Sequence, residues 1–341
     1  MESYKNKKAL FIGNGINLLD IEQSISWKDL LLNLKNRYNI EVDSDNIFKP
    51  FPLMFEEMLY QKEGISELNN KLKNLKRYIR NLIEEQIENK IGYNAYHKKV
   101  AELPYDDILT TNYDYSLENS IVENFIINKD VYAIDKREIK HSLRRGYEVN
   151  NKKIWHIHGE LFDSREHNDP KSYSEESIMI GYEHYSSYLE KIQENIRGKS
   201  GKQKAEKKSI FLRIKDENIG VYWIDTFFTH NIDIIGFGFD FSENHLWWLI
   251  NYRVQNIRIP NKKYKLTINN KIRYFYPRIE NQNNINIENG INFEKIINRA
   301  ASINKNKGIA EILSAFNVEV IQINCNSYNE YYDILLDSYL R

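Results

Sequence analysis

The segment DILTTNYDY, residues 107–115, decides the fold class that the sequence predicts. A short apolar run ends at Leu109, and two threonines, an asparagine and an aspartate follow directly. In open α/β sheets the carboxyl ends of the strands form the ligand crevice, so a polar cluster at such an end indicates a binding site. The same residue types also begin turns and cap helices, and this interpretation stays open for Asp114.

Three further strand-like segments also end in glycine or polar residues. They cover residues 9–12, 152–158 and 232–235. Stretches with helical spacing separate these segments along the chain. We therefore expect an α/β fold with a Rossmann-like parallel sheet that is flanked by helices.

A large helical insertion is predicted after the first strand. Between residues 27 and 102, runs such as WKDLLLNLKNRY and FPLMFEEMLY carry apolar residues at three- and four-residue spacing. We assign residues 1–255 to one domain that includes this insertion. Residues 256–341 are expected to form a C-terminal extension packed on it, with a hairpin near residues 263–276 and a strand over residues 318–323.

Composition excludes several classes of protein and site. The chain has 48 lysine and arginine residues and 48 aspartate and glutamate residues, so its formal net charge is zero. A zero net charge does not favour binding to nucleic acid or to an anionic membrane. Cys325 is the only cysteine, which excludes an internal disulfide and any zinc site of several thiolates. No apolar run approaches the roughly 20 residues of a spanning helix. We expect a cytoplasmic protein without direct, sequence-specific binding to nucleic acid.

Two histidines alternate near the end of the segment at 152–158, and three interpretations of them stay open. Alternation on a strand places His156 and His158 on one face, with Gly159 immediately after them. Either ring can be an ordinary buried side chain, or the pair can bind a metal ion. In the third interpretation, His158 alone acts as a general base at the end of the strand.

A glycine turn follows the first predicted strand. Gly13-Asn14-Gly15 lets the backbone approach a phosphate or a ribose closely, and the start of a helix there would favour an anion. The usual dinucleotide motif has a third glycine where this chain has Leu18. A purely structural turn explains the motif about as well.

Taken in their order along the chain, these motifs resemble the sirtuin-like family. Gly13-Asn14-Gly15-Ile16-Asn17 is similar to the family's Gly-Ala-Gly-x-Ser loop, and Asn112-Tyr113-Asp114 to its Asn-x-Asp motif. His158-Gly159 resembles its catalytic His-Gly, and Gly236-Phe237-Gly238 its later nucleotide-binding turn. SWKDLL at 26–31 also resembles a segment of prokaryotic sirtuin-like effectors. The resemblance spans residues 8–255.

This resemblance implies NAD as the ligand of a Rossmann-like crevice. Breaking the bond between nicotinamide and ribose develops positive charge on the ribose, which favours negative dipoles, a positioned nucleophile and a base. The Asn112 carbonyl is expected to hold a water below the anomeric carbon. His158 is expected to orient or deprotonate a ribose hydroxyl, and Asp114 to accept from the nicotinamide amide.

One departure from the family's protein deacylases decides between activities. Those enzymes carry a zinc module of four cysteines, which a chain with one cysteine cannot build. Helices follow the first loop instead, as in sirtuin-like effectors of bacterial antiphage systems that hydrolyse NAD. The resemblance therefore implies an NAD glycohydrolase that yields nicotinamide and ADP-ribose, without zinc. Two alternatives stay open, a non-catalytic NAD or ADP-ribose sensor and, less favoured, a metal-dependent hydrolase.

The resemblance also implies site residues and partners. Asn17 stands where the family often has serine. Asp20 is assigned as a contact to NAD, although the family's Pro-Asp-Phe-Arg segment is missing. Related effectors act as homo-oligomers, and some act with a hexameric ATPase of the HerA type. The predicted helix HLWWLINYR at 245–253 is expected to pack in the core and not to form an interface with another subunit or with the ATPase. The predicted site comprises the catalytic residues Asn112 and His158 and the NAD-binding residues Gly13, Asn14, Gly15, Asn17, Asp20, Thr111, Asp114, Gly236, Gly238 and Asn244.

Overall fold

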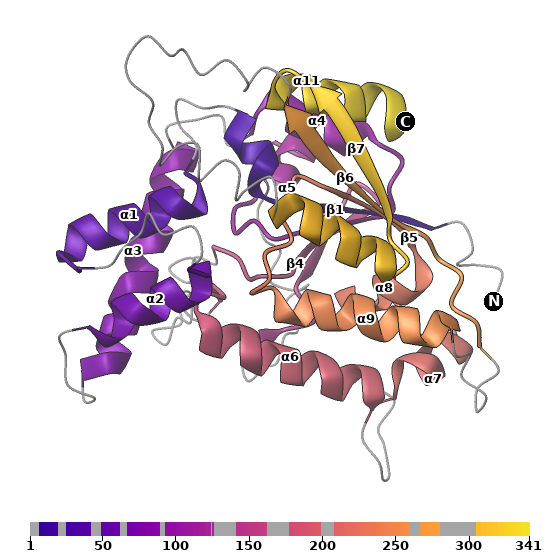
Figure 1. The fold of residues 1–341 in the computed structure, drawn as a ribbon, viewed down its shortest axis with the longest axis horizontal. Helices are drawn as coiled ribbons and strands as arrows, with labels where there is room; N and C mark the ends of the chain where they lie inside the picture. Colours follow the sequence, from indigo (N-terminus) through magenta and orange to yellow (C-terminus); the bar gives the residue numbers. More distant parts are fainter. Residues whose placement is uncertain are drawn as a thin grey trace.

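A single sheet of seven strands organises the computed structural model (Figure 1). The structure describes residues 7–19, 25–41, 49–61, 67–88, 93–123, 125, 141–161, 177–198, 208–258, 266–279 and 305–341. The strands are β1 (Lys8–Ile12), β2 (Asp107–Thr110), β3 (Gly146–Val149), β4 (Lys152–His156), β5 (Asn231–Ile235), β6 (Ile272–Ile279) and β7 (Glu319–Cys325).

The order of the strands is that of a Rossmann fold. They lie as β3-β4-β2-β1-β5-β6-β7, and every neighbouring pair is parallel except β3 with β4. Apart from the antiparallel edge strand β3, the strands follow the order 3-2-1-4-5-6 of dinucleotide-binding sheets. In such sheets ligands bind outside the carboxyl ends where the strand order reverses, here between β1 and β5. The predicted fold class is confirmed.

Four strands end at one level of the sheet. Ile12 of β1 pairs with Thr110 of β2 and with Ile235 of β5, and Thr110 pairs with His156 of β4. The residues that follow each of these strands therefore emerge side by side. This row of strand ends carries the two glycine motifs, the Asn-x-Asp motif and the His-Gly motif.

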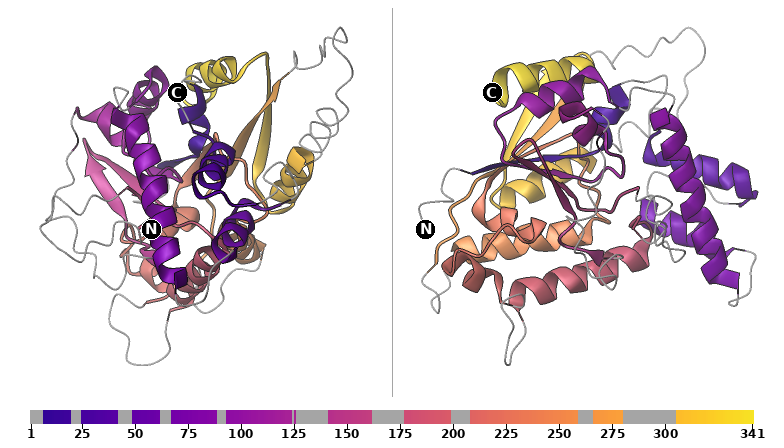
Figure 2. Two further views of the ribbon diagram at one scale, coloured as in Figure 1. Left: turned by 90° about the vertical axis from the view of Figure 1, so that its left-hand side faces the viewer. Right: turned by 180° about the vertical axis from the view of Figure 1, so that it is seen from behind.

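Helices cover both faces of the sheet and its carboxyl edge (Figure 2). They are η1 (Asn14–Leu19), α1 (Trp27–Tyr38), α2 (Phe51–Tyr60), α3 (Leu68–Glu88), α4 (Ala95–Glu102), α5 (Ser116–Ile121), α6 (Tyr182–Arg197), α7 (Ile210–Lys215), η7 (Trp223–Asp225), α8 (Thr226–Thr229), α9 (Asn244–Arg258), α11 (Tyr328–Ile334) and η10 (Leu335–Tyr339), with a further helix over residues 305–315. Figure 1 shows α4, α5 and α11 on one face and α6 to α9 on the other.

The described residues between β1 and β2 are helical or connect helices, as predicted. Ser26 begins α1 with a capping box, because its hydroxyl accepts from the Asp29 amide while the Asp29 carboxylate accepts from the Ser26 amide. α1, α2 and α3 share a core of their own, which also takes in Tyr113, Leu161 and Ile178 from loops after β2 and β4. The three helices therefore pack against the carboxyl edge of the sheet and not against either face.

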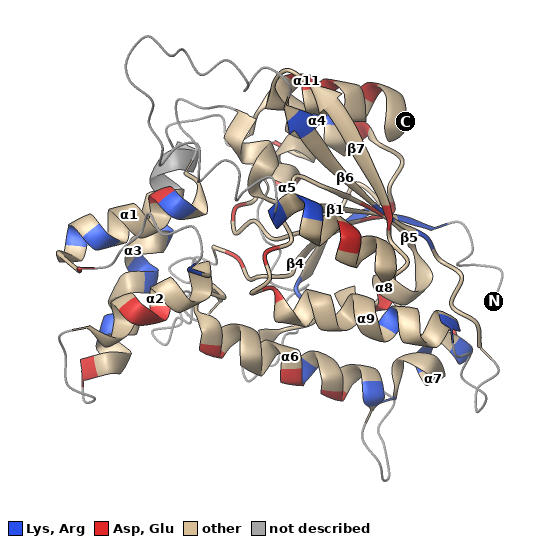
Figure 3. Ribbon diagram, viewed as in Figure 1, with Lys and Arg blue, Asp and Glu red and all other residues tan. Residues whose placement is uncertain are grey.

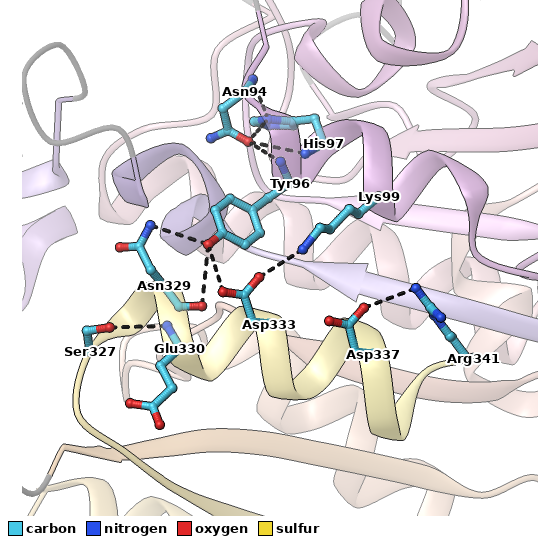
Figure 4. Close-up of polar contacts among 10 residues, drawn as sticks. All are labelled: Asn94, Tyr96, His97, Lys99, Ser327, Asn329, Glu330, Asp333, Asp337 and Arg341. Carbon is cyan, nitrogen blue, oxygen red and sulfur yellow. Dashed lines mark hydrogen bonds and ion pairs between the residues drawn. The ribbon is translucent and has the colours of Figure 1, made fainter.

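The C-terminal residues are part of the sheet. Residues 272–279 run parallel to both β5 and β7, so the predicted hairpin at 263–276 is wrong. The strand predicted over 318–323 matches β7 closely. After β7, α11 contacts α4 through hydrogen bonds of Tyr96 with Asn329 and Asp333 and through an ion pair of Lys99 with Asp333 (Figure 4).

Helix α9 packs in the core, as the sequence analysis favoured. Leu246, Leu249 and Ile250 are fully buried and belong to the cluster that α6 and α8 also line. Figure 3 shows basic and acidic residues interspersed along the helices, in keeping with the zero net charge. None of the helices in the described ranges combines the length and the apolar character that a membrane span requires.

Candidate active site

Two glycine loops meet back to back at the point where the strand order reverses. The Gly13 amide donates to the Ile235 carbonyl and the Gly15 amide to the Gly236 carbonyl, both at 3.1 Å. A β-carbon on Gly13 would lie 2.4 Å from the Gly236 oxygen, so the loops exclude any side chain there. The contact between the loops is thus one reason for glycine at position 13, beside any approach of a ligand.

A tyrosine from the C-terminal helix closes the contact between these loops. A β-carbon on Gly236, where φ is +59°, would lie 2.1 Å from the hydroxyl of Tyr332, and one on Gly15 would lie 3.1 Å from it. The Tyr332 ring is buried, and its hydroxyl has no hydrogen-bond partner within the described residues. Burial raises the pKa of this phenol far above its usual value, so the hydroxyl stays neutral.

A small cleft lies beside these loops, and four of the predicted polar residues line it. It has a volume of about 50 Å³ and is lined by Asn14, Asn17, Ile25, Ser26, Trp27, Leu30, Ile83, Asn112, Tyr113 and Asp114. The lining combines the loop after β1, the loop after β2 and helices α1 and α3. The helical insertion therefore forms one wall of the site.

Asn112 presents an unpaired amide oxygen at this cleft. The residue is 5% exposed, and its Oδ1 has no hydrogen-bond partner in the part of the chain that the structure describes. Its backbone amide donates to the Thr110 hydroxyl at 3.1 Å, and its backbone carbonyl accepts from His156. The backbone of Asn112 is thus fixed on both sides while its side-chain oxygen remains available to a ligand.

A hydrogen-bonded network holds the other polar groups of the cleft in place. The amide of Asn17 donates to Asn14 Oδ1 and to Asp114 Oδ2, each at 3.0 Å. The other oxygen of Asp114 accepts from the amide of Ser116, the first residue of α5, and Asp114 also lines the cleft. The side-chain oxygen of Asn17 lies 3.0 Å from His97 Nε2, which ties the network to α4.

His156 is a positioning residue, and it is not available to a metal ion. Its Nδ1 lies 3.0 Å from the Asn112 carbonyl and its Nε2 lies 2.8 Å from Glu118 Oε1. Both neighbours are acceptors, so both ring nitrogens donate and the ring is an imidazolium. Burial lowers the pKa of His156, but the charge and hydrogen bonds of Glu118 and Asn112 outweigh burial and raise it. The metal-pair interpretation of His156 with His158 is therefore wrong.

His158 lies in a different environment from His156. Strand β4 ends at His156, earlier than predicted, and the chain turns at residues 157–158. His156 contacts the rings of Tyr115 and Tyr147, whereas His158 contacts Tyr185, so the expectation of one shared face is wrong. The turn is fixed by Gly159 at a φ of +99°, where a β-carbon would lie 1.8 Å from the Ser177 carbonyl oxygen.

A second imidazole and a carboxylate adjoin His158. His158 Nε2 lies 3.1 Å from His245 Nε2 and 3.3 Å from Glu243 Oε2. The ring of Tyr185 stacks on His245 at 5.2 Å. Burial and the neighbouring His158 ring lower the pKa of His245 well below its usual value, so His245 is neutral.

The structure brings together part of the predicted site. Asn14, Asn17, Asn112 and Asp114 line one cleft, whereas His158 is absent from the described lining of that cleft. The register of β2 and β4 nevertheless makes their ends neighbours, and Tyr113 lies near enough to Glu243 for that carboxylate to contribute, after burial, to raising its phenol pKa. The two groups of side chains thus adjoin each other across Tyr113.

The remaining predicted residues fall in several places. The Thr111 amide donates to the Ile12 carbonyl, and Gly238 faces open space. Asn244 begins α9 with a buried Oδ1 that lacks a partner among the described residues. Asp20 lies outside the described residues.

Sequence reasoning missed four residues of this region. They are His97, Glu243, His245 and Tyr332, which approach the strand ends from α4, from the turn before α9, from α9 and from α11. The Glu-Asn-His spacing at 243–245 was the one local signal, because it places two metal-ligating residue types in one turn directly after a strand loop.

Comparison with known proteins matches the central part of this site. Residues 106–223 match the family model of the SIR2-like domain, a range that runs from β2 through α7 to the first residue of η7 and includes Asn112 and His158. The match supports the resemblance to sirtuin-like proteins and indicates an NAD-related function. Both glycine loops lie outside the matched range. No curated protein matches the chain significantly.

Proposed function

We propose that this chain is an NAD glycohydrolase, which cleaves the bond between nicotinamide and ribose and releases nicotinamide and ADP-ribose. One observation carries the proposal. The amide oxygen of Asn112 is buried without a partner within the described residues, at a cleft that faces the carboxyl ends of a Rossmann-type sheet. A buried acceptor without a partner costs about 1–3 kcal/mol, so its place at such a cleft is best explained by a ligand or a bound water.

The chemistry of the reaction suits the groups around the cleft. As nicotinamide leaves, positive charge develops on the ribose, and an amide dipole with its oxygen towards that charge stabilises the transition state. The Asn112 oxygen accepts from the attacking water and orients it. The Asp114 carboxylate, which the Asn17 amide holds at 3.0 Å, accepts from the carboxamide of nicotinamide.

His158 supplies the proposed base on the ribose side of the reaction. Its Nε2 lies 3.1 Å from His245 Nε2 and 3.3 Å from Glu243 Oε2, and the end of β4 that carries the ring is next to the end of β2. A ribose hydroxyl that approaches between the two strand ends replaces His245 as the partner of His158. General base catalysis of this kind contributes roughly 10²- to 10⁴-fold to a rate.

The cleft widens when NAD binds in this proposal. Pockets for ligands of this size span roughly 300–1,000 Å³, whereas the cleft measures about 50 Å³. Helices α1 and α3 form the wall that moves, because they pack at the carboxyl edge of the sheet and have a core of their own. Spontaneous opening of this wall gives the purified protein a basal rate of hydrolysis, and a signal or a partner that stabilises the open wall raises that rate.

Nicotinamide release by the purified protein tests the proposal directly. We expect Asn112→Ala and His158→Ala each to lower the rate by roughly 10²-fold or more. His230→Gln is the matched control, because His230 is an equally buried histidine that pairs with Asp107 at the opposite end of the strands. Wild-type rates in both site variants, or an absence of nicotinamide at every protein concentration tested, would contradict the proposal.

The biological role that fits this activity is depletion of NAD during phage infection. We propose that the chain is a cytoplasmic antiphage effector that acts as a homo-oligomer and needs no zinc for hydrolysis. A HerA-type hexameric ATPase is the proposed partner. Infection of cells that carry the wild-type gene or the Asn112→Ala gene, with NAD measured over time, tests this role. An equal decline of NAD in both strains would count against it.

The small volume of the cleft favours one second candidate, a non-catalytic sensor of NAD or ADP-ribose. In a sensor, tight binding with slow opening replaces turnover. Calorimetry distinguishes the two functions. A sensor binds ADP-ribose with a micromolar or lower dissociation constant, while NAD in the same solution stays intact. Release of nicotinamide in that solution would exclude the sensor.

A further inference from the structure

We propose that His158, Glu243 and His245 form a binding site for a zinc ion at the end of β4. The three side chains come from two separate places in the chain, the turn after β4 and the turn that begins α9. None of the three ligands is a cysteine, so the presence of a single cysteine in the chain does not exclude this zinc site. The site differs from the His156 and His158 pair considered from the sequence.

The distances among the three ligand atoms suit a tetrahedral ion. They are 3.1 Å from His158 Nε2 to His245 Nε2, 3.3 Å from His158 Nε2 to Glu243 Oε2, and 3.7 Å from His245 Nε2 to Glu243 Oε2. Bonds of 2.0–2.1 Å to zinc in a tetrahedron place neighbouring ligand atoms about 3.4 Å apart. An ion therefore fits among these atoms with shifts of a few tenths of an ångström.

The donor types select zinc over the common hard cations. Two imidazoles and one carboxylate form a ligand set of catalytic zinc sites, whereas magnesium and calcium prefer oxygen alone. The side chains of His158 and His245 are 2% and 0% exposed and that of Glu243 is 12% exposed, which gives an ion an approach from the carboxylate side.

The backbone around Glu243 holds the carboxylate in place. Asp240 accepts from the Ser242 amide and hydroxyl, and the Glu243 amide donates to the Asp240 carbonyl at 3.0 Å. Lys305 forms an ion pair with the same Asp240, so the turn is tied to the helix over residues 305–315. A rigid turn lowers the entropy that the ligands lose when an ion binds.

Zinc at this site inhibits NAD hydrolysis, a consequence that rests on the proposed function. Zinc occupies His158 Nε2, the atom that would otherwise contact the ribose hydroxyl. Zinc binding itself does not depend on that function. The two are therefore tested by separate measurements.

Titration of metal-free full-length protein with Zn²⁺ in a calorimeter tests the site without any NAD. We expect one ion per chain and no comparable binding of Mg²⁺. Glu243→Gln and His245→Phe should each weaken zinc roughly 100-fold or more, and His230→Gln should bind as the wild type does. Absence of zinc binding, or equal affinity in both ligand variants, would overturn the site.

A spectroscopic measurement on the wild type covers the case in which the variants do not fold. X-ray absorption of the zinc-loaded protein should show two imidazole ligands and a first shell of nitrogen and oxygen near 2.0–2.1 Å. A first shell without imidazole would overturn the site.

Nicotinamide release with increasing zinc then tests the inhibition. We expect the wild type and His230→Gln to lose activity over the same zinc concentrations, and His245→Phe to need at least tenfold more zinc relative to its own zinc-free rate. Equal inhibition of His245→Phe would overturn the inhibition. If no NAD is hydrolysed at all, the proposed function fails while the zinc titration still decides the site.

Discussion

Single atoms decide how closely the two glycine loops and α11 pack. The Tyr332 hydroxyl lies where a side chain on Gly236 would begin, and Gly236 has a φ of +59°. The identity of residue 236 is therefore coupled to one oxygen atom that lies 96 positions further along the chain. Such a coupling can be measured with a double-mutant cycle.

We predict that Gly236→Ala lowers the free energy of unfolding by at least about 2 kcal/mol. Left-handed backbone costs a β-carbon roughly 1–2 kcal/mol, and the contact with Tyr332 adds to this cost. Tyr332→Phe alone should be nearly neutral, since it removes a hydroxyl without a partner among the described residues. Urea unfolding at equilibrium measures both changes.

The double variant is the control for this prediction. Gly236→Ala with Tyr332→Phe should be more stable than Gly236→Ala alone by about 1–2 kcal/mol, because the remaining ring carbon lies 3.4 Å from the new methyl group. Strict additivity of the two changes would show that the hydroxyl does not limit residue 236.

The sequence predicts some of these side chains and misses others for a physical reason. Asn112 and Asp114 follow a strand in DILTTNYDY, so the rule that ligands bind at strand ends identifies them. Tyr332 and His97 reach the same edge from helices that no local spacing connects to the strands. Their positions follow from tertiary packing, which short motifs do not encode.

The imidazolium of His156 joins strand β4 to helix α5 through Glu118. Both side chains are fully buried, and the atoms lie 2.8 Å apart. The contact also fixes the Asn112 carbonyl, so it links two elements of the sheet edge to the candidate catalytic residue.

We predict that this pair stabilises the protein more at low pH than at high pH. The folded state raises the pKa of His156 above its ordinary value near 6.5, through Glu118 and in spite of burial. The stabilisation is therefore fully present below about pH 6.5 and is lost as pH rises through the folded pKa. Wild type should exceed Glu118→Gln by about 3 kcal/mol at pH 6 and by less at pH 9.

Unfolding by urea at both pH values checks this difference. His230→Gln provides the comparison, because His230 pairs with Asp107 away from the candidate site. A difference between wild type and Glu118→Gln that grows with pH would contradict the raised pKa of His156.

Secondary structure near β4 shows why periodicity alone misplaced His158. Alternation puts residues 156 and 158 on one face only while the strand continues, and β4 ends at His156. Gly159, at a φ of +99°, follows the turn at 157–158 and favours this early end. The glycine was visible in the sequence, but its backbone angle depends on the contact with Ser177.

The whole sheet was more predictable than any of its sites. Parallel strands that end in polar residues and alternate with helices specify a Rossmann-type order. The sequence did not predict the antiparallel edge strand β3 or the strand β6, which replaces an expected hairpin. Strand β3 has one neighbour, and β6 is specified by its pairing with β5 and β7 and not by a local repeat, so local pattern constrains these two strands least. The core strands β1, β2 and β5 are constrained on both sides.

In the proposed function, the helical insertion is the wall that moves, and its response to NAD is the last prediction. Trp27 of α1 lines the cleft and contacts the Tyr113 ring at a centroid distance of 5.3 Å. NAD cannot enter a cleft of about 50 Å³ unless this contact opens. We therefore expect a non-hydrolysable carbocyclic NAD analogue to change the tryptophan fluorescence of the wild type in a saturable way.

Most of that signal should come from one of the five tryptophans. Trp27→Phe should lose at least about half of the change, because an aromatic ring at a wall that moves exchanges protein contacts for ligand and water. Trp248→Phe should keep it, since Trp248 stacks on Tyr252 within α9, on a face of the sheet away from α1. An undiminished change in Trp27→Phe would mean that NAD binds without moving α1 away from the sheet.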